Sequence, residues 1–191
     1  RIAGKNAFHA ARTSISRQTV HSYHGHDFAE LFWIDSGFAI HRANGESISL
    51  PAHSLVLMRP ADCHRIDQAE AHEVRLTNIA FPRETLQALG RRYFGGQAWG
   101  FWHDAPLPAT HVLEPSQLAR FNRWADELSR APQERLHIER FLLNVLAELS
   151  LESPAAALDD APDWLIRACD LIPRPEHFSG GVEKFLQLCG R

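Results

Sequence analysis

Four residues whose types and spacing suit a divalent metal ion lie in two short segments: His24, His26 and Glu30, and further along His64. His24 and His26 would point to one side of a β-strand, because side chains alternate between its faces. On a straight strand Glu30 would lie roughly 13 Å beyond His26, so it can join them only if residues 27–29 turn and Glu30 begins the next strand. Imidazole nitrogens and carboxylate oxygens bind divalent metals at about 2.0–2.2 Å. We therefore predict half a metal site here, with His64 as the candidate further ligand.

The composition is ordinary for a soluble globular protein, with 45% hydrophobic and 23% charged residues among 191. No apolar run reaches the roughly 18 residues of a membrane span, and no signal-peptide pattern opens the chain. The 3 cysteines are odd in number and widely separated, which does not fit a disulfide framework. We therefore expect a cytoplasmic protein without a membrane partner. The net charge of −3 gives no electrostatic footprint for nucleic acid.

The first part of the chain, residues 8–81, has an all-β pattern. Its short, β-rich segments are expected at 8–14, 29–35, 38–43, 47–50, 55–58, 64–68 and 74–81. Asn44-Gly45 between two of them is a strong hairpin signal. Many short strands at this spacing favour a sandwich or barrel. Pro82 ends the pattern, a short helix is expected at 83–93, and a glycine- and aromatic-rich loop follows.

The second part is helical. Residues 116–130 and 134–149 each place apolar side chains on one face with a period of about 3.6 residues, and Pro132 breaks the chain between them. Such a pair either covers one face of the barrel or pairs across a dimer, and both arrangements remain open. Residues 150–162 have the composition of a linker. Behind it, two short helices at 163–172 and 182–190 are too small to stand alone, so we expect them to open a domain that has been cut off.

The metal-site residues lie in a motif that resembles the cupin superfamily. His24, His26, Glu30 and Gly37 match its first pattern, H-x-H, three residues, E, six residues, G. His64 fills the ligand position of the second motif, and the resemblance implies that all four ligands bind Zn, Ni, Mn or Fe. A hydrogen-bonded polar cluster without a metal is the alternative.

The second motif departs from the family pattern at several positions. His53 and Ala61 stand where the family favours glycine, Pro60 is shifted by one place, and Gln68 replaces an asparagine. His53 can take up a left-handed turn conformation, which histidine visits more readily than most residues. We expect the other histidines, apart from the four ligands, to occupy mostly surface or turn positions.

The order of parts resembles the AraC family of transcriptional regulators, and within it the regulators of chitooligosaccharide (chitobiose) operons. The likeness rests on H-G-H-D-F-A-E-L, on the Asn44-Gly45 hairpin, on R-L-T-N-I-A-F, and on D-D-A-P-D-W-L leading into F-S-G-G-V-E-K-F-L-Q-L-C-G-R. It implies a mainly β fold: a small cupin-type (double-stranded β-helix) barrel, then helices, then the start of a truncated helix-turn-helix domain. The implied domains are a metal- and effector-binding barrel, a loop with a dimerising helical pair, a linker and the start of the DNA-binding domain, at 1–95, 96–149, 150–162 and 163–191.

This resemblance implies a small-molecule effector in the barrel, with an amino sugar or oligosaccharide as the leading candidate. The chain would form a homodimer and reach DNA only through the missing part of the last domain. A sugar site needs hydrogen-bonding groups and aromatic faces, and the candidate contacts are Phe28, Phe32, Arg59, Arg75 and Asn78. Parity with Glu30 turns Phe28 and Phe32 inward and Trp33 outward. Residues of these types in such strands are more often core packing or a solvated edge than ligand contacts.

Two other functions compete with the sensor. A metal-dependent cupin enzyme, such as a dioxygenase, isomerase or deacetylase, would use the same ligands to activate water or dioxygen, with Glu30 free to act as a base. A metal-free interaction module would use none of them. The helical second half favours the regulator, because catalysis gives no reason for a linker and a cut-off helix pair.

Overall fold

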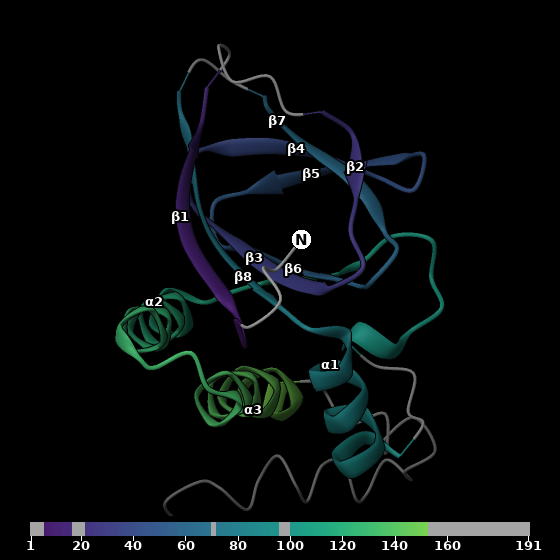
Figure 1. Ribbon diagram of the computed structural model, residues 1–191. Coiled ribbons are helices and arrows are strands. Elements are labelled where there is room, and N and C mark those ends of the chain that lie inside the picture. Colours follow the sequence, from purple (N-terminus) through teal and green to yellow (C-terminus); the bar gives the residue numbers. More distant parts are fainter. Residues whose placement is uncertain (1–5, 17–21, 70–71, 96–99, 153–191) are drawn as a thin grey trace, which may run out of the picture. The chain divides into compact units, whose positions relative to one another are not determined.

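The computed structural model describes residues 6–16, 22–69, 72–95 and 100–152. Nine strands form two antiparallel sheets within these residues. The five-stranded sheet contains, in spatial order, β1 (His9–Ile15), β8 (Val74–Phe81), β3 (Ala29–Ser36), β6 (Ser54–Met58) and β9 (Ala109–Val112). The four-stranded sheet contains β2 (His24–Gly25), β7 (Cys63–Gln68), β4 (Phe38–Ala43) and β5 (Glu46–Pro51). The sheets face each other and enclose a small barrel (Figure 1).

Helical segments follow the strands. They are α1 (Arg83–Leu89), the π-helical turn η1 (Gly90–Phe94), the 3-10 turn η2 (Gly100–Trp102), α2 (Pro115–Arg130) and α3 (Arg135–Glu152). By its contacts the chain divides into two compact units, one ending at Val145 and the other starting at Leu146. Among the described helices, none has the length and apolarity needed to cross a membrane.

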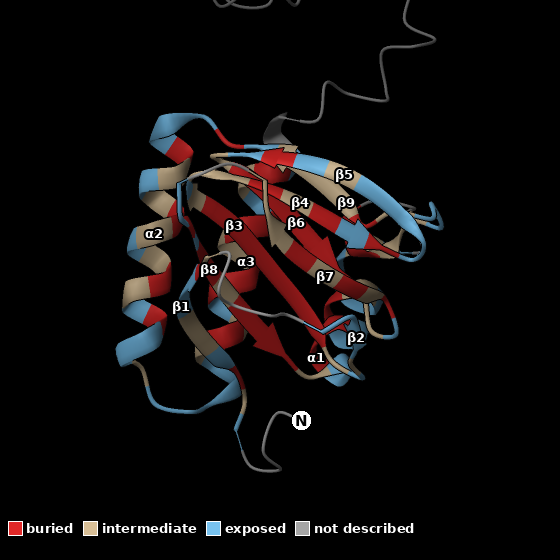
Figure 2. Cartoon of the chain, turned by 90° about the horizontal axis from the view of Figure 1, so that it is seen from above, coloured by how far each residue is buried: buried red, intermediate tan, exposed pale blue. Residues whose placement is uncertain are grey.

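The central strand β3 is buried on both faces, because the barrel interior lies on one side and α2 on the other. All residues from Ala29 to Ile34 are buried (Figure 2). On the outer side, the Trp33 ring packs edge-on against Phe121 of α2 with centroids 5.9 Å apart, and its Nε1 donates a hydrogen bond to Asn122 Oδ1 at 3.2 Å. The predicted outward orientation of Trp33 is thereby confirmed.

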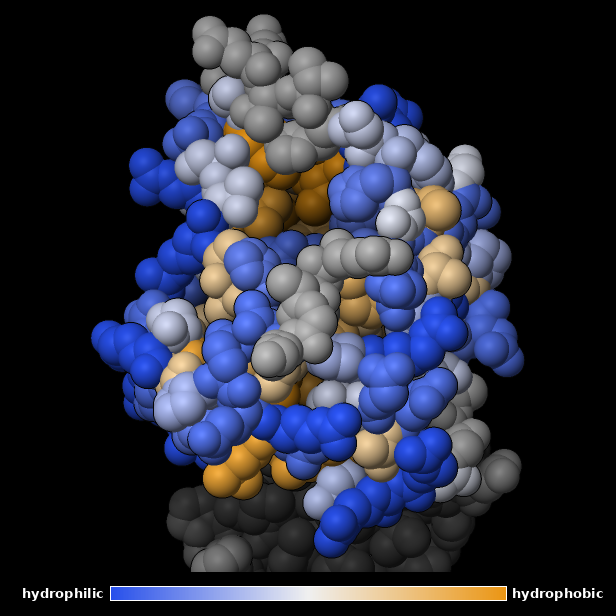
Figure 3. Space-filling model, viewed as in Figure 1, coloured by the Kyte–Doolittle hydropathy of each residue, from blue (hydrophilic) through white to orange (hydrophobic). Residues whose placement is uncertain are grey.

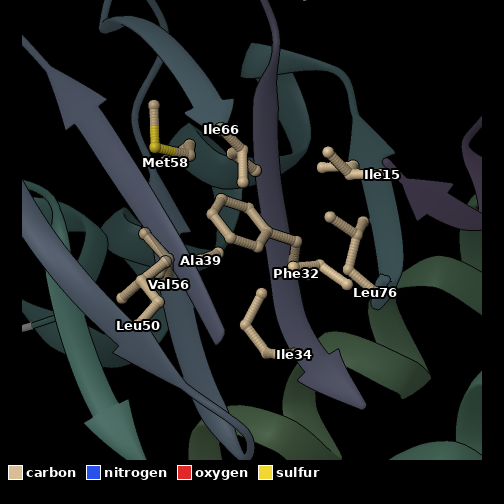
Figure 4. Close-up of a cluster of buried hydrophobic side chains, with 10 residues drawn as sticks. Ile15, Phe32, Ile34, Ala39, Leu50, Val56, Met58, Ile66 and Leu76 are labelled. Atoms are coloured by element: carbon tan, nitrogen blue, oxygen red, sulfur yellow. The ribbon is translucent and has the colours of Figure 1, made fainter. Parts of the chain in front are cut away.

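The barrel interior is filled by apolar side chains from both sheets (Figure 4). The buried cluster consists of Ile15, Phe32, Ile34, Ala39, Leu50, Val56, Met58, Ile66, Val74 and Leu76. Phe32 projects from β3 into the middle of this cluster, as its parity with Glu30 predicts (Figure 4). Removing this much apolar surface from water stabilises the fold by roughly 25 cal/mol per Å² buried. Three members of the cluster, Ile15, Ile66 and Leu76, also line the cavity of the barrel.

Tight turns set the positions of several strands. Asn44 and Gly45 both have positive φ, 51° and 90°, as the predicted two-residue hairpin between β4 and β5 requires. His53 and Ala61 also adopt the left-handed conformation, with φ of 74° and 78°, at the two positions where the cupin pattern favours glycine. Gly37 has φ of 94°, and a Cβ there would lie 2.7 Å from the carbonyl oxygen of Glu73. These backbone shapes agree with the pattern even where the residue types depart from it.

The predicted strands and helices agree with the structure to within a few residues, with three corrections. Strand β2 ends at Gly25, so His26 does not share a strand with His24 as predicted. Strand β9 pairs with β6 inside the segment 96–149, which the sequence analysis assigned to a loop and two helices. Helix α3 continues to Glu152, into the segment predicted as a linker. The rest of that linker and the predicted helix-turn-helix start lie outside the described residues.

Helix α2 covers the outer face of the five-stranded sheet, which is one of the two arrangements left open by the sequence. Besides the Trp33 contact, Asp126 of α2 pairs with Arg12 of β1 at 2.9 Å. The face of α2 that carries Phe121, Ala125 and Leu128 is buried. Pairing across a dimer stays a prediction.

Candidate metal centre

Strands β3 and β7 and the loop after β2 bring three of the predicted ligands, Glu30, His64 and His26, together at one end of the barrel. His24 in β2 lies directly opposite His64 in β7, and Glu30 lies in β3 of the other sheet. The chain bends at Asp27 and Phe28 and then enters β3 at Ala29. This is the turn that the spacing of His26 and Glu30 requires.

His26, Glu30 and His64 form a compact group. One potential ligand atom from each lies within 4.8 Å of the others. The carboxylate oxygen Glu30 Oε2 is 3.0 Å from His26 Nε2 and 4.0 Å from His64 Nε2. All three side chains are almost fully buried, with at most 7% of their surface exposed. A cation between these atoms would exchange a few waters for a charged oxygen and two nitrogens, which is a favourable ligand set for a first-row metal.

The other ring nitrogen of His26 is held by the backbone. Its Nδ1 donates to the carbonyl oxygen of Phe28 at 2.8 Å, because a carbonyl oxygen can only accept. In a neutral ring, Nε2 then carries a lone pair and not a proton. The lone pair faces the Glu30 carboxylate, so two electron-rich atoms meet at 3.0 Å unless a cation or a proton lies between them.

His24 is oriented in the same way, by a backbone carbonyl oxygen, but it lies nearer the protein surface than His26. Its Nδ1 donates to the carbonyl oxygen of Ser22 at 2.9 Å, which leaves Nε2 free. Its ring centroid is 4.8 Å from that of His64 and 6.3 Å from that of His26. His24 is exposed and does not belong to the compact group of three.

Buried nitrogens without partners provide the test of whether these residues fit a metal. Within the described residues, Nε2 of His26 and Nε2 of His64 are both buried, and neither makes a hydrogen bond. Leaving a buried polar atom unsatisfied costs about 1–3 kcal/mol. A divalent cation would satisfy both nitrogens and the carboxylate at once. The donor set therefore fits a metal ion.

Asn78 of β8 orients the carboxylate. Its side-chain amide donates to Glu30 Oε1, so Oε2 is the oxygen directed toward the two histidines. Phe32 pairs with Asn78 across β3 and β8, which places Asn78 on the inner face of the barrel beside Glu30. Glu30 thus has one oxygen held by the protein and one available.

The protonation of the two buried imidazoles differs. Burial lowers the pKa of His64 to about 4, although the Glu30 charge acts in the opposite direction. Burial also works against protonation of His26, but the adjacent Glu30 carboxylate outweighs it and raises the pKa of His26. His64 is therefore neutral at pH 7, as a ligand must be. His26 and Glu30 can share a proton, which is how the metal-free polar cluster would be stabilised.

A cavity of about 280 Å³ adjoins this group. Its lining residues are His9, Thr13, Ile15, His24, Phe28, Glu30, His64, Ile66, Leu76, Asn78 and Ala80. Most of the polar residues lie around Glu30 and on the wall formed by β1 and β8, while Ile15, Ile66 and Leu76 give an apolar side. Hydrophobic side chains are visible inside hollows on this face of the molecule (Figure 3).

Comparison with known families is decisive for the class of protein. The model of the AraC-like ligand binding domain matches residues 10–161, most of the chain. This chain is a member of the AraC-like ligand-binding domain family. A comparison with the curated proteins found no match.

Solved structures resemble this AraC-like domain in fold. An apo variant of ToxT from Vibrio cholerae has a TM-score of 0.58 at 14% identity, and the match covers 96% of this chain and 69% of ToxT. ToxT bound to (E)-4-(8-methylnaphthalen-1-yl)but-3-enoic acid has a TM-score of 0.53 at 13% identity, covering 97% of this chain and 77% of ToxT. A cupin 2 conserved barrel domain protein from Salinispora arenicola matches 48% of this chain and 76% of its own, with a TM-score of 0.39 and 14% identity.

Three of the predicted effector contacts in this AraC-like domain lie close to the candidate metal ligands His26, Glu30 and His64. Phe28 lines the cavity and stacks on His26, with ring centroids 4.1 Å apart and an angle of 7° between the planes. Asn78 lines the cavity beside Glu30. Phe32 is fully buried in the barrel core, with its ring centroid 6.3 Å from that of His64, so it supports the site from below.

Both arginines predicted as effector contacts lie away from the group of His26, Glu30 and His64. Arg59 binds Asp62 through Nη2 at 2.9 Å and the carbonyl oxygens of His103 and Ala105 through Nη1 at 2.9 and 2.8 Å. It therefore ties the segment before β9 to the turn before β7. Arg75 is exposed and lies 3.5 Å from Glu73, on the opposite face of β8 from Asn78. Neither arginine lines the cavity beside Glu30. Arg75 lines a different cavity, together with Arg12 and Asp35.

His41 is the residue that the sequence analysis missed. It was grouped with the surface histidines, but it is fully buried in β4. Its Nε2 lies 3.2 Å from Nδ1 of His64. The available signal was strand parity, because His41 shares the inner face of β4 with Ala39 and Ala43, and Ala43 lies opposite His64.

Proposed function

We propose that this chain is the ligand-sensing region of an AraC-type transcriptional regulator, with a divalent metal ion held by His26, Glu30 and His64 and completed by His24. Membership of the AraC-like ligand-binding family supports the sensing role. One observation carries the metal: two buried Nε2 atoms without hydrogen bonds lie beside a single carboxylate oxygen. Zn, Ni, Mn and Fe all suit this ligand set.

The site can hold an effector through both the metal and the cavity wall. When bound, the metal supplies a positive centre that attracts an oxygen of the effector. Asn78 and Thr13 offer hydrogen bonds, and Phe28 offers an aromatic face near the ligands. At about 280 Å³ the cavity is slightly smaller than the range of about 300–1,000 Å³ for ligand pockets. A single amino sugar, or one end of a chitooligosaccharide, is the effector that we propose.

The remaining roles belong to the regulator as a whole. We propose that DNA binding belongs to a helix-turn-helix domain that includes residues 163–191. The helical pair α2 and α3 is the proposed dimer contact, and the cytoplasm is the proposed location. The barrel itself has no role in operator contact in this proposal.

A metal-dependent cupin enzyme is the second candidate. It is favoured by the cavity beside the ligand group, because an open position on the metal can hold a substrate as well as an effector. Glu30 would then be the base. A sensor returns its ligand unchanged, whereas an enzyme consumes it.

Thermal-shift measurements on residues 1–191 test the proposal. The metal-free and Zn-loaded forms are each heated with glucosamine, N-acetylglucosamine and their disaccharides. A ligand that binds only the folded state stabilises it by about 2.7 kcal/mol at 100 times Kd, and this stabilisation raises Tm. We expect stabilisation of the Zn-loaded form alone, its loss in Asn78→Leu, and recovery of intact sugar by chromatography. No stabilisation by any amino sugar would contradict the proposed effector, and consumption of the sugar would favour the enzyme.

A further inference from the structure

His41 is fully buried, although burying an imidazole is costly without good partners. Its Nε2 lies 3.2 Å from Nδ1 of His64, and the two rings meet edge to face at 89° with centroids 5.4 Å apart. The other partner of His41 is the Phe32 ring, also edge to face at 5.4 Å between centroids. His41 is therefore held in one orientation, with one nitrogen aimed at the ring that is the proposed ligand.

The three histidines of the candidate centre differ in what holds their Nδ1 atoms. His24 and His26 donate to backbone carbonyl oxygens, which can only accept, so their Nε2 lone pairs are set by the backbone. The Nδ1 of His64 faces another imidazole, which can either donate or accept. The tautomer of His64 is thus coupled to that of His41.

We propose that His41 is a positioning residue that selects the metal-binding tautomer of His64 by accepting a hydrogen bond from its Nδ1–H. The proposal rests on the metal site proposed above. Metal-binding histidines generally donate their second ring N–H to an acceptor, which fixes the ring and raises its basicity. A carbonyl or a carboxylate could only accept, whereas the imidazole of His41 can change from acceptor to donor by changing its tautomer.

The protons of the pair balance in both states. Two neutral rings carry two ring protons. With a metal on His64 Nε2, one proton lies on His64 Nδ1 and is donated to His41 Nε2, so the other lies on His41 Nδ1. Without a metal, the reverse arrangement is available: His41 Nε2–H donates to His64 Nδ1, and the second proton lies on His64 Nε2, near the Glu30 carboxylate at 4.0 Å. The switch moves both protons within the pair and releases none.

The surroundings of His41 agree with a ring that must be able to change tautomer. His41 Nδ1 is buried and makes no hydrogen bond to any described residue, so no fixed acceptor or donor commits the ring to one form. The charged group that acts on it is Asp62, from the turn before β7, and Glu30 and the rings of His24 and His26 act on His64. A fixed partner at His41 Nδ1 would hold His64 permanently in one of its two forms.

Zn affinity measured by chelator competition tests the role of His41. His41→Phe keeps an aromatic ring at this buried position and removes both nitrogens, whereas His41→Gln keeps an acceptor oxygen. We expect about 10–100-fold weaker Zn binding in His41→Phe, the usual effect of losing an outer partner of a ligand, and partial recovery in His41→Gln. Ile34→Val, from the same buried core, is the control for lost packing and should bind Zn like the wild type.

Nitrogen-15 NMR of the histidine rings tests the tautomers directly in the wild-type chain and does not depend on the folding of a variant. In the Zn-loaded chain we expect protons on His64 Nδ1 and His41 Nδ1. A proton on His41 Nε2 in that state, or unchanged Zn affinity in His41→Phe, would overturn the role of His41 while leaving the metal site intact. A wild-type chain that binds no Zn, Ni, Mn or Fe would overturn the metal site and with it this proposal.

Discussion

His26 Nε2 and Glu30 Oε2 lie 3.0 Å apart, at the junction between the loop after β2 and the start of β3. The far edge of the His26 ring is held by the Phe28 carbonyl oxygen, and Glu30 Oε1 is held by Asn78. Each group is thus oriented by a hydrogen bond on its other side. A carboxylate oxygen and an imidazole lone pair repel each other at this distance unless a positive charge lies between them. A metal ion or a shared proton can supply it, and this choice is the chemical centre of the site.

Replacing Glu30 with glutamine should separate these two possibilities. The Glu30 carboxylate raises the pKa of His26, so Glu30→Gln should lower that pKa in the metal-free chain. An NMR titration of the His26 ring measures it, and the conservative size of glutamine preserves the packing. The same variant should bind Zn more weakly, because a charged oxygen ligand is lost. An unchanged His26 titration would show that the two groups do not interact in solution.

The metal-free chain should lose stability as the pH falls below neutral. Burial holds the pKa of both His41 and His64 at about 4, below the ordinary value of 6.5. Between these two pH values the unfolded chain binds more protons than the folded chain, so each such histidine reduces the stability by about 1.4 kcal/mol per pH unit as the pH falls. His26, whose pKa is raised, acts in the opposite sense.

Urea unfolding in EDTA at pH 7 and pH 5 measures this dependence. The free energy of unfolding should fall less between pH 7 and pH 5 in His41→Phe than in the wild type. The difference should equal the contribution of one such histidine, on the order of 1–2 kcal/mol. Equal losses in the variant and the wild type would mean that His41 is not buried as a neutral ring.

Replacing Ala61 with glycine should stabilise the fold. The φ of Ala61, 78°, lies in the left-handed region, which costs an L-residue roughly 1–2 kcal/mol relative to glycine. Ala61→Gly should therefore raise the free energy of unfolding by about 1 kcal/mol, after the entropy that glycine loses on folding. Ala10→Gly, in the extended strand β1, is the matched control and should lower stability by roughly 0.5–1 kcal/mol. Destabilisation by both substitutions would contradict the strain at Ala61.

Arg59 should matter for stability and not for the metal. Its side chain holds the buried Asp62 and the segment before β9, and its contribution keeps the pKa of Asp62 lowered despite burial. Arg59→Leu would leave a buried carboxylate unpaired, which costs about 3–5 kcal/mol. Urea unfolding should show this loss, while Zn bound per folded chain should stay unchanged below the midpoint. A selective loss of Zn without a loss of stability would restore a direct role for Arg59 in the site.

The sequence predicted most strands because they are short, β-rich and separated by turns, some of which have a strict conformational requirement. The Asn44-Gly45 hairpin and the bend before Glu30 are examples. Strand β9 was missed because it has four residues and no alternating apolar pattern. The extension of α3 was missed because Ser150 and the residues after it have no strong helical period.

The site was predictable where spacing alone fixes geometry. His26 and Glu30 follow from one short segment, and the structure places His64 beside them. His24, predicted on the same side of a strand as His26, is exposed and lies outside the compact group. His41 was hidden because the apolar residues of its strand, Phe38 and Ile40, lie on the half-exposed face while the histidine and two alanines face inward. Arg75 shows the reverse case, since its three-residue offset from Asn78 on one strand already excludes a shared face.

The metal content of the purified chain, measured by elemental analysis beside His64→Ala and a His53→Asn control, tests the central claim most directly. The control residue lies in a left-handed turn that asparagine tolerates. We expect about one divalent ion per wild-type and control chain, since a site of this kind holds a single cation, and little or none in His64→Ala. Equal metal in all three chains, or none in the wild type after incubation with Zn, would contradict the site.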